Sequence, residues 1–280
     1  MPNFEMVVPT RERAIELIDQ HAPDSLKPLL KQCVRPAIAL RIEKIDDAEI
    51  PTGASKFGGS PDVPADFEWP TWQDKPLGLL AQINLQEMAP FDVEGLLPRH
   101  GILLFFYEME EMFVPDDEAQ GTWRVLWIEN GPLSRRQPPA NIPPKNISAV
   151  PPGRIFAATE LTTLDACDLD LSSEEYDAFT ADFLPNFGRQ KDIHRMLGNT
   201  ENIQDSVLMV NEMRRLGVTK YHEHEAAILR GYADWLLLLQ VQSDNHFPES
   251  WGDWGTLYFT IQREALLTRQ FGETLFELQF

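Results

Sequence analysis

A repeated pair of apolar segments constrains the fold of this chain more than any other feature. Four segments form two similar pairs: LLAQINL (79–85) with LLLQVQS (237–243), and GILLFFYEME (101–110) with GTLYFTIQRE (255–264). The first pair aligns Gln82 with Gln240, and a Gly-containing stretch precedes each, FGGSPDVP in one half and MLGNTENIQ in the other. Two half-sheets too small to bury their apolar faces alone would share one core. The pattern predicts an internally duplicated β-rich core, with chance similarity of Leu-rich strands as the alternative.

Apolar periodicity predicts an α+β fold with an N-terminal helical arm. Thr10 is positioned to cap a helix over 11–21, and a second short helix is expected over 25–33. PAIALRIEK alternates apolar and polar residues, which is typical of a half-buried strand. The repeated apolar segments and TWRVLWIEN instead predict strands buried on both faces. A helix is also predicted at 174–184, after a Ser172–Glu175 capping box, and another at 202–216, ending at Gly217. A further helix is expected at 222–233, and a final edge strand at 274–280.

The composition favours one globular domain over the whole of residues 1–280. Hydrophobic residues make up 43% and charged residues 24% of the chain, values close to those of ordinary globular proteins. We expect an arm at about 1–35 and repeat halves at about 36–150 and 151–280. The Pro-rich stretch 130–152 is interpreted as a connection between the halves rather than a linker between domains.

The charge of the chain excludes some partners and favours others. With 24 basic and 44 acidic residues, the formal net charge is −20. Such a field repels phosphate backbones, so nucleic-acid binding is not expected. It attracts a basic protein or a cationic ligand. The alternative is that the acidity only maintains solubility.

The compartment is predicted from cysteine use and from the absence of long apolar runs. Only Cys33 and Cys167 are present, so there is no disulfide framework and no Cys-based zinc spacing. The longest apolar run, 235–239, is too short to cross a bilayer, and the first residues lack a secretory pattern. We expect a cytoplasmic, monomeric protein without a membrane segment.

The loop GASKFGGSP contains the residue types of an anion cradle. Its glycines, hydroxyls and Lys56 are suited to hold an anion through backbone N–H groups. It is not a P-loop, because Lys56 precedes Gly58 and Gly59 instead of following the second glycine. The alternative is that the glycines permit tight turns and that Lys56 pairs with an acidic residue.

Two acidic and histidine-rich segments contain residue types that bind metal ions. HEHE at 222–225 would present both histidines on one side only in an extended chain, and the sequence there predicts a helix. SDNHFPESWGDWG gathers Asp244 and Asp253 without the order of a calcium loop, and a turn capped by a carboxylate is the favoured interpretation. We therefore predict no metal site and no cofactor.

Catalytic chemistry has no support in the sequence. Neither cysteine has an activating motif, and no GxSxG elbow is present.

Four tryptophans, at 69, 72, 251 and 254, lie in corresponding loop regions of the two halves. They are suited either to line a cleft or to close the ends of the core.

Several motifs together resemble the YwqG-like family of bacterial proteins of unknown function. They are SKFGGSPDVPADFEWP, KPLGLLAQINL, LPRHGILLFFY, MLGNTENIQ, WLLLLQVQSD and WGDWGTLYF, which extend from about residue 36 to the end. The resemblance implies an α+β fold with internal duplication but no established activity. Some members lie near secreted polymorphic toxins, which implies an immunity role for part of the family. The predicted helix around 203–216 departs from the family's more Gly- and Pro-rich pattern.

Two functional hypotheses follow. The first is a protein-binding module, of the immunity type, that neutralises a basic toxin through an acidic surface. The second is a small-ligand-binding or enzymatic cleft between the two repeats. The residues predicted to bind a ligand there are Lys56, Trp69, Gln82, Gln240, Asp244 and Asp253.

Overall fold

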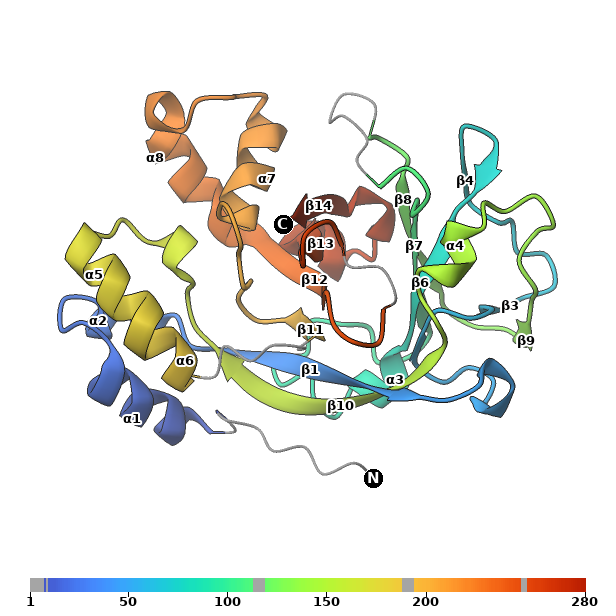
Figure 1. Cartoon of the computed structure of the whole chain (residues 1–280), viewed down its shortest axis with the longest axis horizontal. Coiled ribbons are helices and arrows are strands. Elements are labelled where there is room, and N and C mark those ends of the chain that lie inside the picture. Colours follow the sequence, from blue (N-terminus) through green and yellow to red (C-terminus); the bar gives the residue numbers. More distant parts are fainter. Residues whose placement is uncertain (1–7, 9, 113–118, 188–193, 248–250) are drawn as a thin grey trace.

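The computed structural model describes residues 8, 10–112, 119–187, 194–247 and 251–280. Its main element is a ten-stranded sheet with the order β14-β13-β12-β11-β1-β10-β2-β6-β7-β8, in which every pairing is antiparallel (Figure 1). The strands are β1 (Arg35–Lys44), β2 (Lys56–Phe57), β6 (Gly78–Asn84), β7 (Ile102–Tyr107), β8 (Trp123–Ile128), β10 (Gly153–Thr162), β11 (His194–Leu197), β12 (Trp235–Gln242), β13 (Thr256–Gln262) and β14 (Leu275–Gln279). A large antiparallel sheet with several helices agrees with the predicted α+β class.

The sheet has two four-stranded arms on either side of a central pair. β1 and β10 pair along their full lengths, from Arg35 opposite Thr162 to Lys44 opposite Gly153. One arm is β2-β6-β7-β8 and the other is β11-β12-β13-β14. Both arms contain a bulge in their second strand, between 79 and 81 in β6 and between 237 and 239 in β12. The arms rise from the central pair, so that the sheet curls and its edge strands β8 and β14 approach each other (Figure 1).

The concave side of the sheet contains the main core. Its buried apolar side chains come from all parts of the sheet and include Leu40, Phe57, Phe105, Leu238 and Phe259. The outer faces of the two arms are covered differently. Over β6 and β7 lie the segments with β3 (Asp62–Val63), β4 (Thr71–Trp72), β5 (Lys75–Pro76), β9 (Ser134–Arg135) and α4 (Lys145–Ser148). On the other arm α7 (Val207–Leu216) packs on β12 and β13, and α8 (Tyr221–Gly231) packs on α7.

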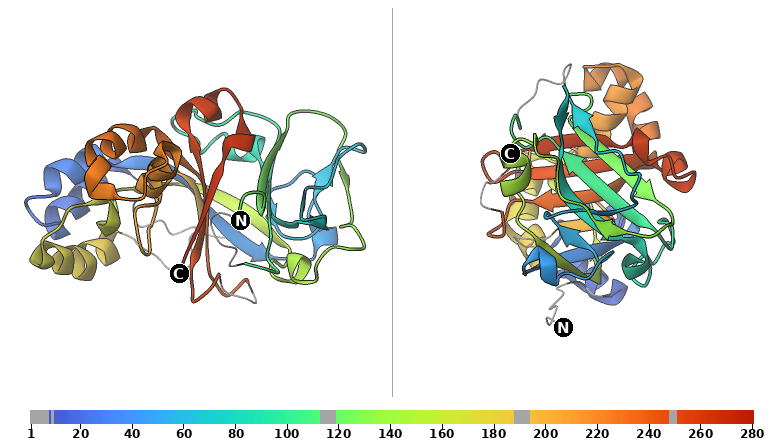
Figure 2. Two further views of the ribbon diagram at one scale, coloured as in Figure 1. Left: turned by 90° about the horizontal axis from the view of Figure 1, so that it is seen from above. Right: turned by 90° about the vertical axis from the view of Figure 1, so that its right-hand side faces the viewer.

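The N-terminal helices pack against helices from the second half of the chain. α1 (Arg11–His21) and α2 (Lys27–Gln32) share an apolar cluster with the π-helical segment Phe179–Phe183 and α6 (Leu184–Phe187), which continue the chain after α5 (Ser173–Ala178) (Figures 1 and 2). Thr10 caps α1 by accepting from the Arg13 N–H at 3.2 Å, as predicted. α1 and α2 therefore form one side of a small helical layer at the end of the sheet.

Several elements differ from the sequence prediction. β10 and β11 were not predicted, although β10 lies at the centre of the sheet. The helix expected at 202–216 begins only at Val207, after Ser206. β8 was expected to be buried on both faces, but it is an edge strand with one buried residue, Val125, because no described strand pairs with its second edge. The helix over HEHE, the Ser172–Glu175 capping box and the left-handed Gly217 are confirmed.

The remaining described elements are short connections: α3 (Leu85–Met88), α9 (Arg263–Leu267), and 3-10 turns at Asp47–Glu49, Ala166–Asp168, Tyr232–Asp234 and Phe271–Glu273. Among the helices of the described ranges, none combines the length and apolar character that a bilayer crossing requires.

Candidate functional site

The predicted anion cradle is occupied by a carboxylate of the chain itself. Gly58 and Gly59 both have positive φ, so the turn after β2 directs the Ser60 N–H inward, where it donates to Asp47 at 3.1 Å. The Lys56 ammonium is fully buried and donates to the same carboxylate at 2.7 Å. Burial lowers the pKa of Lys56, and the bond to Asp47 opposes that shift. The arrangement matches the alternative interpretation, in which Lys56 pairs with an acidic residue.

Gln82 belongs to the same buried network. Its side-chain oxygen accepts from the Asp62 N–H at 2.7 Å, and its nitrogen donates to the Ala54 carbonyl at 2.8 Å and to Asp62 Oδ2 at 2.9 Å. Arg135 donates to Asp62 Oδ1 at 3.0 Å. Burial alone would raise the pKa of Asp62, but the bonds from Arg135 and Gln82 outweigh it and lower that pKa. These hydrogen bonds hold the loop that contains Asp62 against β6 of the first arm.

The second arm has a corresponding but less complete network. Arg195 lies opposite Gln240, as Lys56 lies opposite Gln82. Arg195 is buried between Glu160 and Glu201, each 2.8 Å from a guanidinium nitrogen. Gln240 accepts from the Glu201 N–H at 3.1 Å. Within the described residues, however, Gln240 Nε2 and Glu201 Oε2 are buried without a hydrogen-bond partner.

Asp244 organises a turn next to two buried histidines. It accepts from the backbone N–H groups of His246 and Phe247. His194 Nδ1 accepts from the Gln242 N–H at 3.2 Å, so its proton resides on Nε2, which donates to Asp244 at 3.1 Å. Burial opposes the shift, but the bond from His194 lowers the pKa of Asp244. Phe57 and Phe247 pack on the His194 ring, so this group belongs to the core.

The remaining predicted residues lie elsewhere. Trp69 is half-buried on the outer face of the first arm, where its Nε1 donates to the Leu77 carbonyl at 2.9 Å. Asp253 is exposed in the turn before β13, beside Trp254, which is 61% exposed. The structure thus brings Lys56 and Gln82 together but does not gather all six residues at one cavity. Their role in ligand binding stays a prediction.

A different place in the molecule has the geometry of a binding site: the seam between the two edge strands. In the second arm the Ser243 N–H donates to the Gly255 carbonyl, so residue 255 of the hairpin bonds towards β12. Antiparallel pairing alternates, so residues 275, 277 and 279 of β14 bond to β13, and residues 274, 276 and 278 direct their N–H and C=O groups outward. Trp123 Nε1 confirms this direction, because it reaches the Thr274 carbonyl from the β8 side at 2.9 Å.

The facing strand has the same arrangement. The Glu108 N–H donates to the Thr122 carbonyl, which directs residues 122, 124, 126 and 128 towards β7. Residues 123, 125 and 127 of β8 therefore present their backbone groups outward, towards β14. Among the described residues, neither edge pairs with another strand, and the two edges face each other across the seam.

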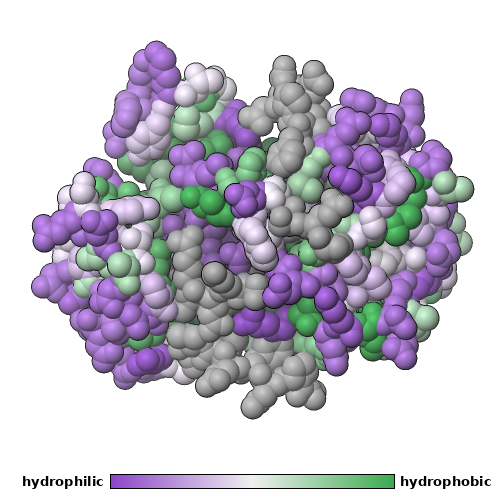
Figure 3. Space-filling view, viewed as in Figure 1, coloured by the Kyte–Doolittle hydropathy of each residue, from purple (hydrophilic) through white to green (hydrophobic). Residues whose placement is uncertain are grey.

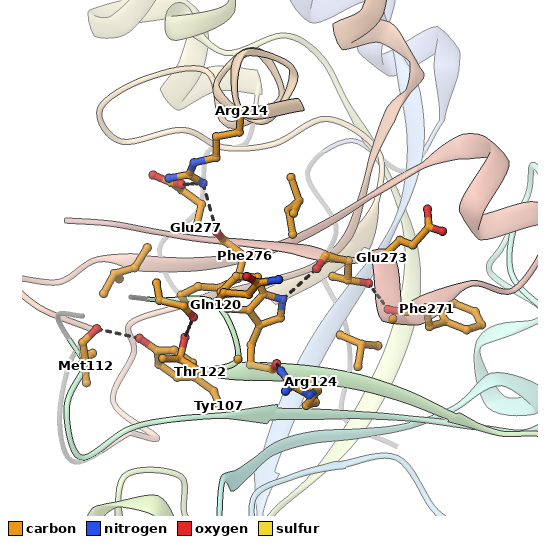
Figure 4. Close-up of a pocket in the computed structure, with 18 of the residues that line it drawn as sticks. Tyr107, Met112, Gln120, Thr122, Arg124, Arg214, Phe271, Glu273, Phe276 and Glu277 are labelled. Carbon is orange, nitrogen blue, oxygen red and sulfur yellow. Dashed lines mark hydrogen bonds and ion pairs between the residues drawn. The ribbon is translucent and has the colours of Figure 1, made fainter. Parts of the chain in front are cut away.

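A cavity of about 1050 Å³ opens between these edges, and we call it the seam groove. Its walls come from β7, β8, β14, α7 and the turn before β14, and include Tyr107, Thr122, Trp123, Arg214, Phe276 and Leu278 (Figure 4). Phe276 lies on its floor, 4.5 Å from the ring centre of Tyr107 and 5.6 Å from that of Trp123. The groove thus combines an aromatic floor with open backbone groups along its sides.

The charged side chains of the seam groove differ in their partners and exposure. Arg214 forms an ion pair with Glu277. Arg124 donates to the carbonyl of Trp123 at 2.8 Å, so a cation covers part of the β8 edge. Glu273 is exposed in the 3-10 turn before β14, and no ion pair involving it is found among the described residues (Figure 4). Burial raises the pKa of Tyr107, whose hydroxyl stays neutral and donates to the Met112 carbonyl.

None of the six residues predicted from the sequence lines the seam groove. The groove residues were missed because each belongs to an ordinary strand pattern, and their proximity depends on the curl of the sheet. One signal was available: TLFELQF was predicted as an edge strand, and an edge strand has an unpaired side. The described residues also contain no group of three or more His, Cys, Asp or Glu side chains placed to hold a metal ion.

Comparison with known proteins identifies a family but not an activity. No curated protein matches the chain. A family model described as a domain of unknown function, DUF1963, matches residues 55–279, which include both arms of the sheet and the seam groove. The chain therefore belongs to the DUF1963 family.

Proposed function

We propose that this protein is a binding module that holds an extended, cationic segment of a partner protein in the seam groove. The observation that carries the proposal is the pair of unpaired sheet edges, β8 and β14, that face each other across a cavity of about 1050 Å³. Natural sheets protect their edges, because an open edge pairs with other chains. An edge held open over an aromatic floor is a docking place for a strand-like ligand.

The charge of the molecule supports a cationic partner. The formal net charge is −20, and hydrophilic side chains dominate the face seen in Figure 3. Within the groove Arg214 is neutralised by Glu277, whereas Glu273 is exposed on the β14 side. A basic segment would therefore be attracted over a long range by the whole molecule and would find a carboxylate at the groove.

The origin of the groove agrees with internal duplication, which we propose on three correspondences. The two arms have the same strand order from the centre outward, the same bulge, and paired turns with positive φ at Gly58–Gly59 and Leu197–Gly198. The groove then lies where the last strands of the two repeats meet. We also propose that the chain belongs to a YwqG-like branch of the family. In one setting, a monomeric chain in the cytoplasm would use the module to neutralise a basic toxin.

A small molecule is the second candidate occupant of the same groove. Its volume lies just above the range of about 300–1,000 Å³ that is usual for ligand pockets, and Tyr107, Trp123 and Phe276 supply the aromatic surface that such ligands use. Binding of peptides and binding of small molecules are separated by the experiment below.

The test is a selection of random twelve-residue peptides displayed on phage against the purified full chain. We expect enriched sequences that are extended and rich in Lys and Arg. Their affinity should fall roughly threefold to tenfold in Glu273→Lys, because reversal of a nearby charge removes about 0.7–1.4 kcal/mol. Glu174→Lys, on the distant helix α5, changes the net charge equally and should have little effect.

Two results would count against the proposal. If no peptide is enriched and a small-molecule screen yields groove binders, the groove holds a small ligand instead. If the two charge reversals weaken peptide binding equally, only the overall charge attracts the peptides and the groove is not their site.

A further inference from the structure

We propose that the partner segment pairs with β14 as an added antiparallel strand, through main-chain hydrogen bonds to Phe276 and Leu278. This inference rests on the proposed function, and it names the edge, the direction and the residue pattern of the partner. An added strand of this kind would extend the ten-stranded sheet by one strand within the seam groove.

The open hydrogen-bonding groups of β14 define the contact. Residues 276 and 278 direct their backbone groups away from β13, into the groove. In the part of the chain that the structure describes, only the Phe276 carbonyl has a partner, Arg214 at 3.4 Å. The Phe276 N–H and both backbone groups of Leu278 have no hydrogen bond there. A strand paired with residues 276 and 278 would provide partners for the Phe276 N–H and for both backbone groups of Leu278.

The β8 edge is less suited to accept a strand. Its Trp123 carbonyl accepts from the Arg124 guanidinium at 2.8 Å, a shorter bond than the 3.4 Å one from Arg214 to the Phe276 carbonyl of β14, and a charged side chain on an edge discourages pairing. Farther along, Arg269 lies over the Trp127 ring at 4.9 Å, and Phe271 packs beside the same ring at 6.0 Å. The segment 269–271, which leads into β14, therefore covers β8 near Trp127.

The direction follows from the topology. All neighbouring strands of the sheet are antiparallel, so the first strand, β14, and the tenth, β8, run in opposite directions. A strand between them is antiparallel to one and parallel to the other. Antiparallel pairing is slightly more stable per residue, which favours a partner antiparallel to β14.

The two faces of β14 predict an alternating partner sequence. Phe276 and Leu278 face the core side of the sheet, so every second partner side chain would lie over the aromatic floor and should be apolar. The intervening side chains would lie on the outer face, near exposed Asp205, whose carbonyl accepts from Gln279. These positions should be Lys or Arg. The expected motif alternates apolar and basic residues over about five positions, the length of β14.

The experiment compares two substitutions at one position. Leu278→Pro removes the outward N–H and blocks strand addition, yet it leaves the bonds to β13 intact because these are made by the neighbouring residues. Leu278→Ala removes the side chain but keeps the N–H. For a peptide selected as above, we expect affinity at least tenfold lower in Leu278→Pro than in Leu278→Ala, with both variants folded by circular dichroism.

A second measurement uses the wild-type chain, so that it does not depend on the folding of a variant. Each backbone nitrogen of the selected peptide is methylated in turn. An added strand bonds through every second residue, so binding should be lost at alternate positions and kept at the others.

The outcomes separate this inference from the proposed function. If Glu273→Lys weakens binding but the methylation scan is flat and Leu278→Pro equals Leu278→Ala, peptides bind in the groove without pairing, and the strand-addition inference is wrong. If the scan alternates while Leu278→Pro binds normally, pairing is with β8, which overturns the assignment to β14. If no peptide binds, the proposed function itself fails.

Discussion

The two buried glutamines should respond very differently to the same substitution, although they occupy corresponding positions in the two arms. Gln82 and Gln240 are both fully buried, and each lies opposite a buried basic residue. Gln82 makes three hydrogen bonds, whereas within the described residues Gln240 makes one and its nitrogen has no partner. Substitution by Met keeps the side chain near its original size and removes the amide.

The magnitude follows from the groups left unsatisfied. Gln82→Met leaves the Asp62 N–H and the Ala54 carbonyl buried without partners, and at about 1–3 kcal/mol each this lowers the free energy of unfolding by about 2–6 kcal/mol. Gln240→Met leaves one such group, the Glu201 N–H, but it also removes an amide nitrogen that is itself buried without a partner. These two effects are similar and opposite, so the net change should lie within about 1 kcal/mol of zero.

Urea denaturation followed by circular dichroism measures both variants against wild type. A large loss of stability in Gln82→Met together with a small change in Gln240→Met would support the contrast. Equal losses would refute the reasoning, because they would mean that Gln240 has partners equivalent to those of Gln82. A larger loss in Gln240→Met would contradict it more strongly.

Two further predictions concern backbone strain and pH. Gly59→Ala should destabilise the protein by more than the roughly 1–2 kcal/mol expected for a left-handed alanine, because the new Cβ would clash with an Asp47 carboxylate oxygen. Gly95→Ala, at similar φ but in open space, should show only the backbone strain, and equal urea midpoints for the two variants would argue against the cradle. Burial lowers the pKa of His246 despite its bond to the Pro151 carbonyl, so its contribution to stability is present above its unfolded pKa of about 6.5 and is lost as pH falls through the lower folded value. Thermal melts should therefore lose stability below about pH 6.5 more steeply for wild type than for His246→Gln, and parallel curves would show that another group is responsible.

Much of the sheet could be predicted from the sequence, because its buried strands have continuous apolar composition. β6, β7, β12 and β13 match the predicted segments. β1 forms where a strand was predicted, but its middle residues 37–40 are all buried instead of alternating between buried and exposed. β10 could not be predicted in the same way, because most of its residues are only half-buried and it carries polar side chains such as Glu160 and Thr162. Its strand conformation is set by ten cross-strand pairs to β1, which are contacts distant in sequence.

The candidate site was harder to predict, for a physical reason. Lys56 and the glycines signalled an anion cradle, but the anion is Asp47, and no local pattern shows that a carboxylate nine residues earlier folds back onto the turn. The seam groove depends on a still longer relation, since Trp123 and Phe276 meet only because ten strands curl. Residue types alone do not contain that curvature.

Hydrogen exchange of the β14 amides, resolved by residue with NMR, tests the central claim most directly. In the free chain the amides of Glu277 and Gln279, bonded to β13, should exchange slowly, and those of Phe276 and Leu278 should exchange fast. Addition of a selected basic peptide should protect Phe276 and Leu278 and leave the other two unchanged. If Phe276 and Leu278 are already protected in the free chain, or stay unprotected when peptide is bound, β14 is not the edge that receives a partner strand.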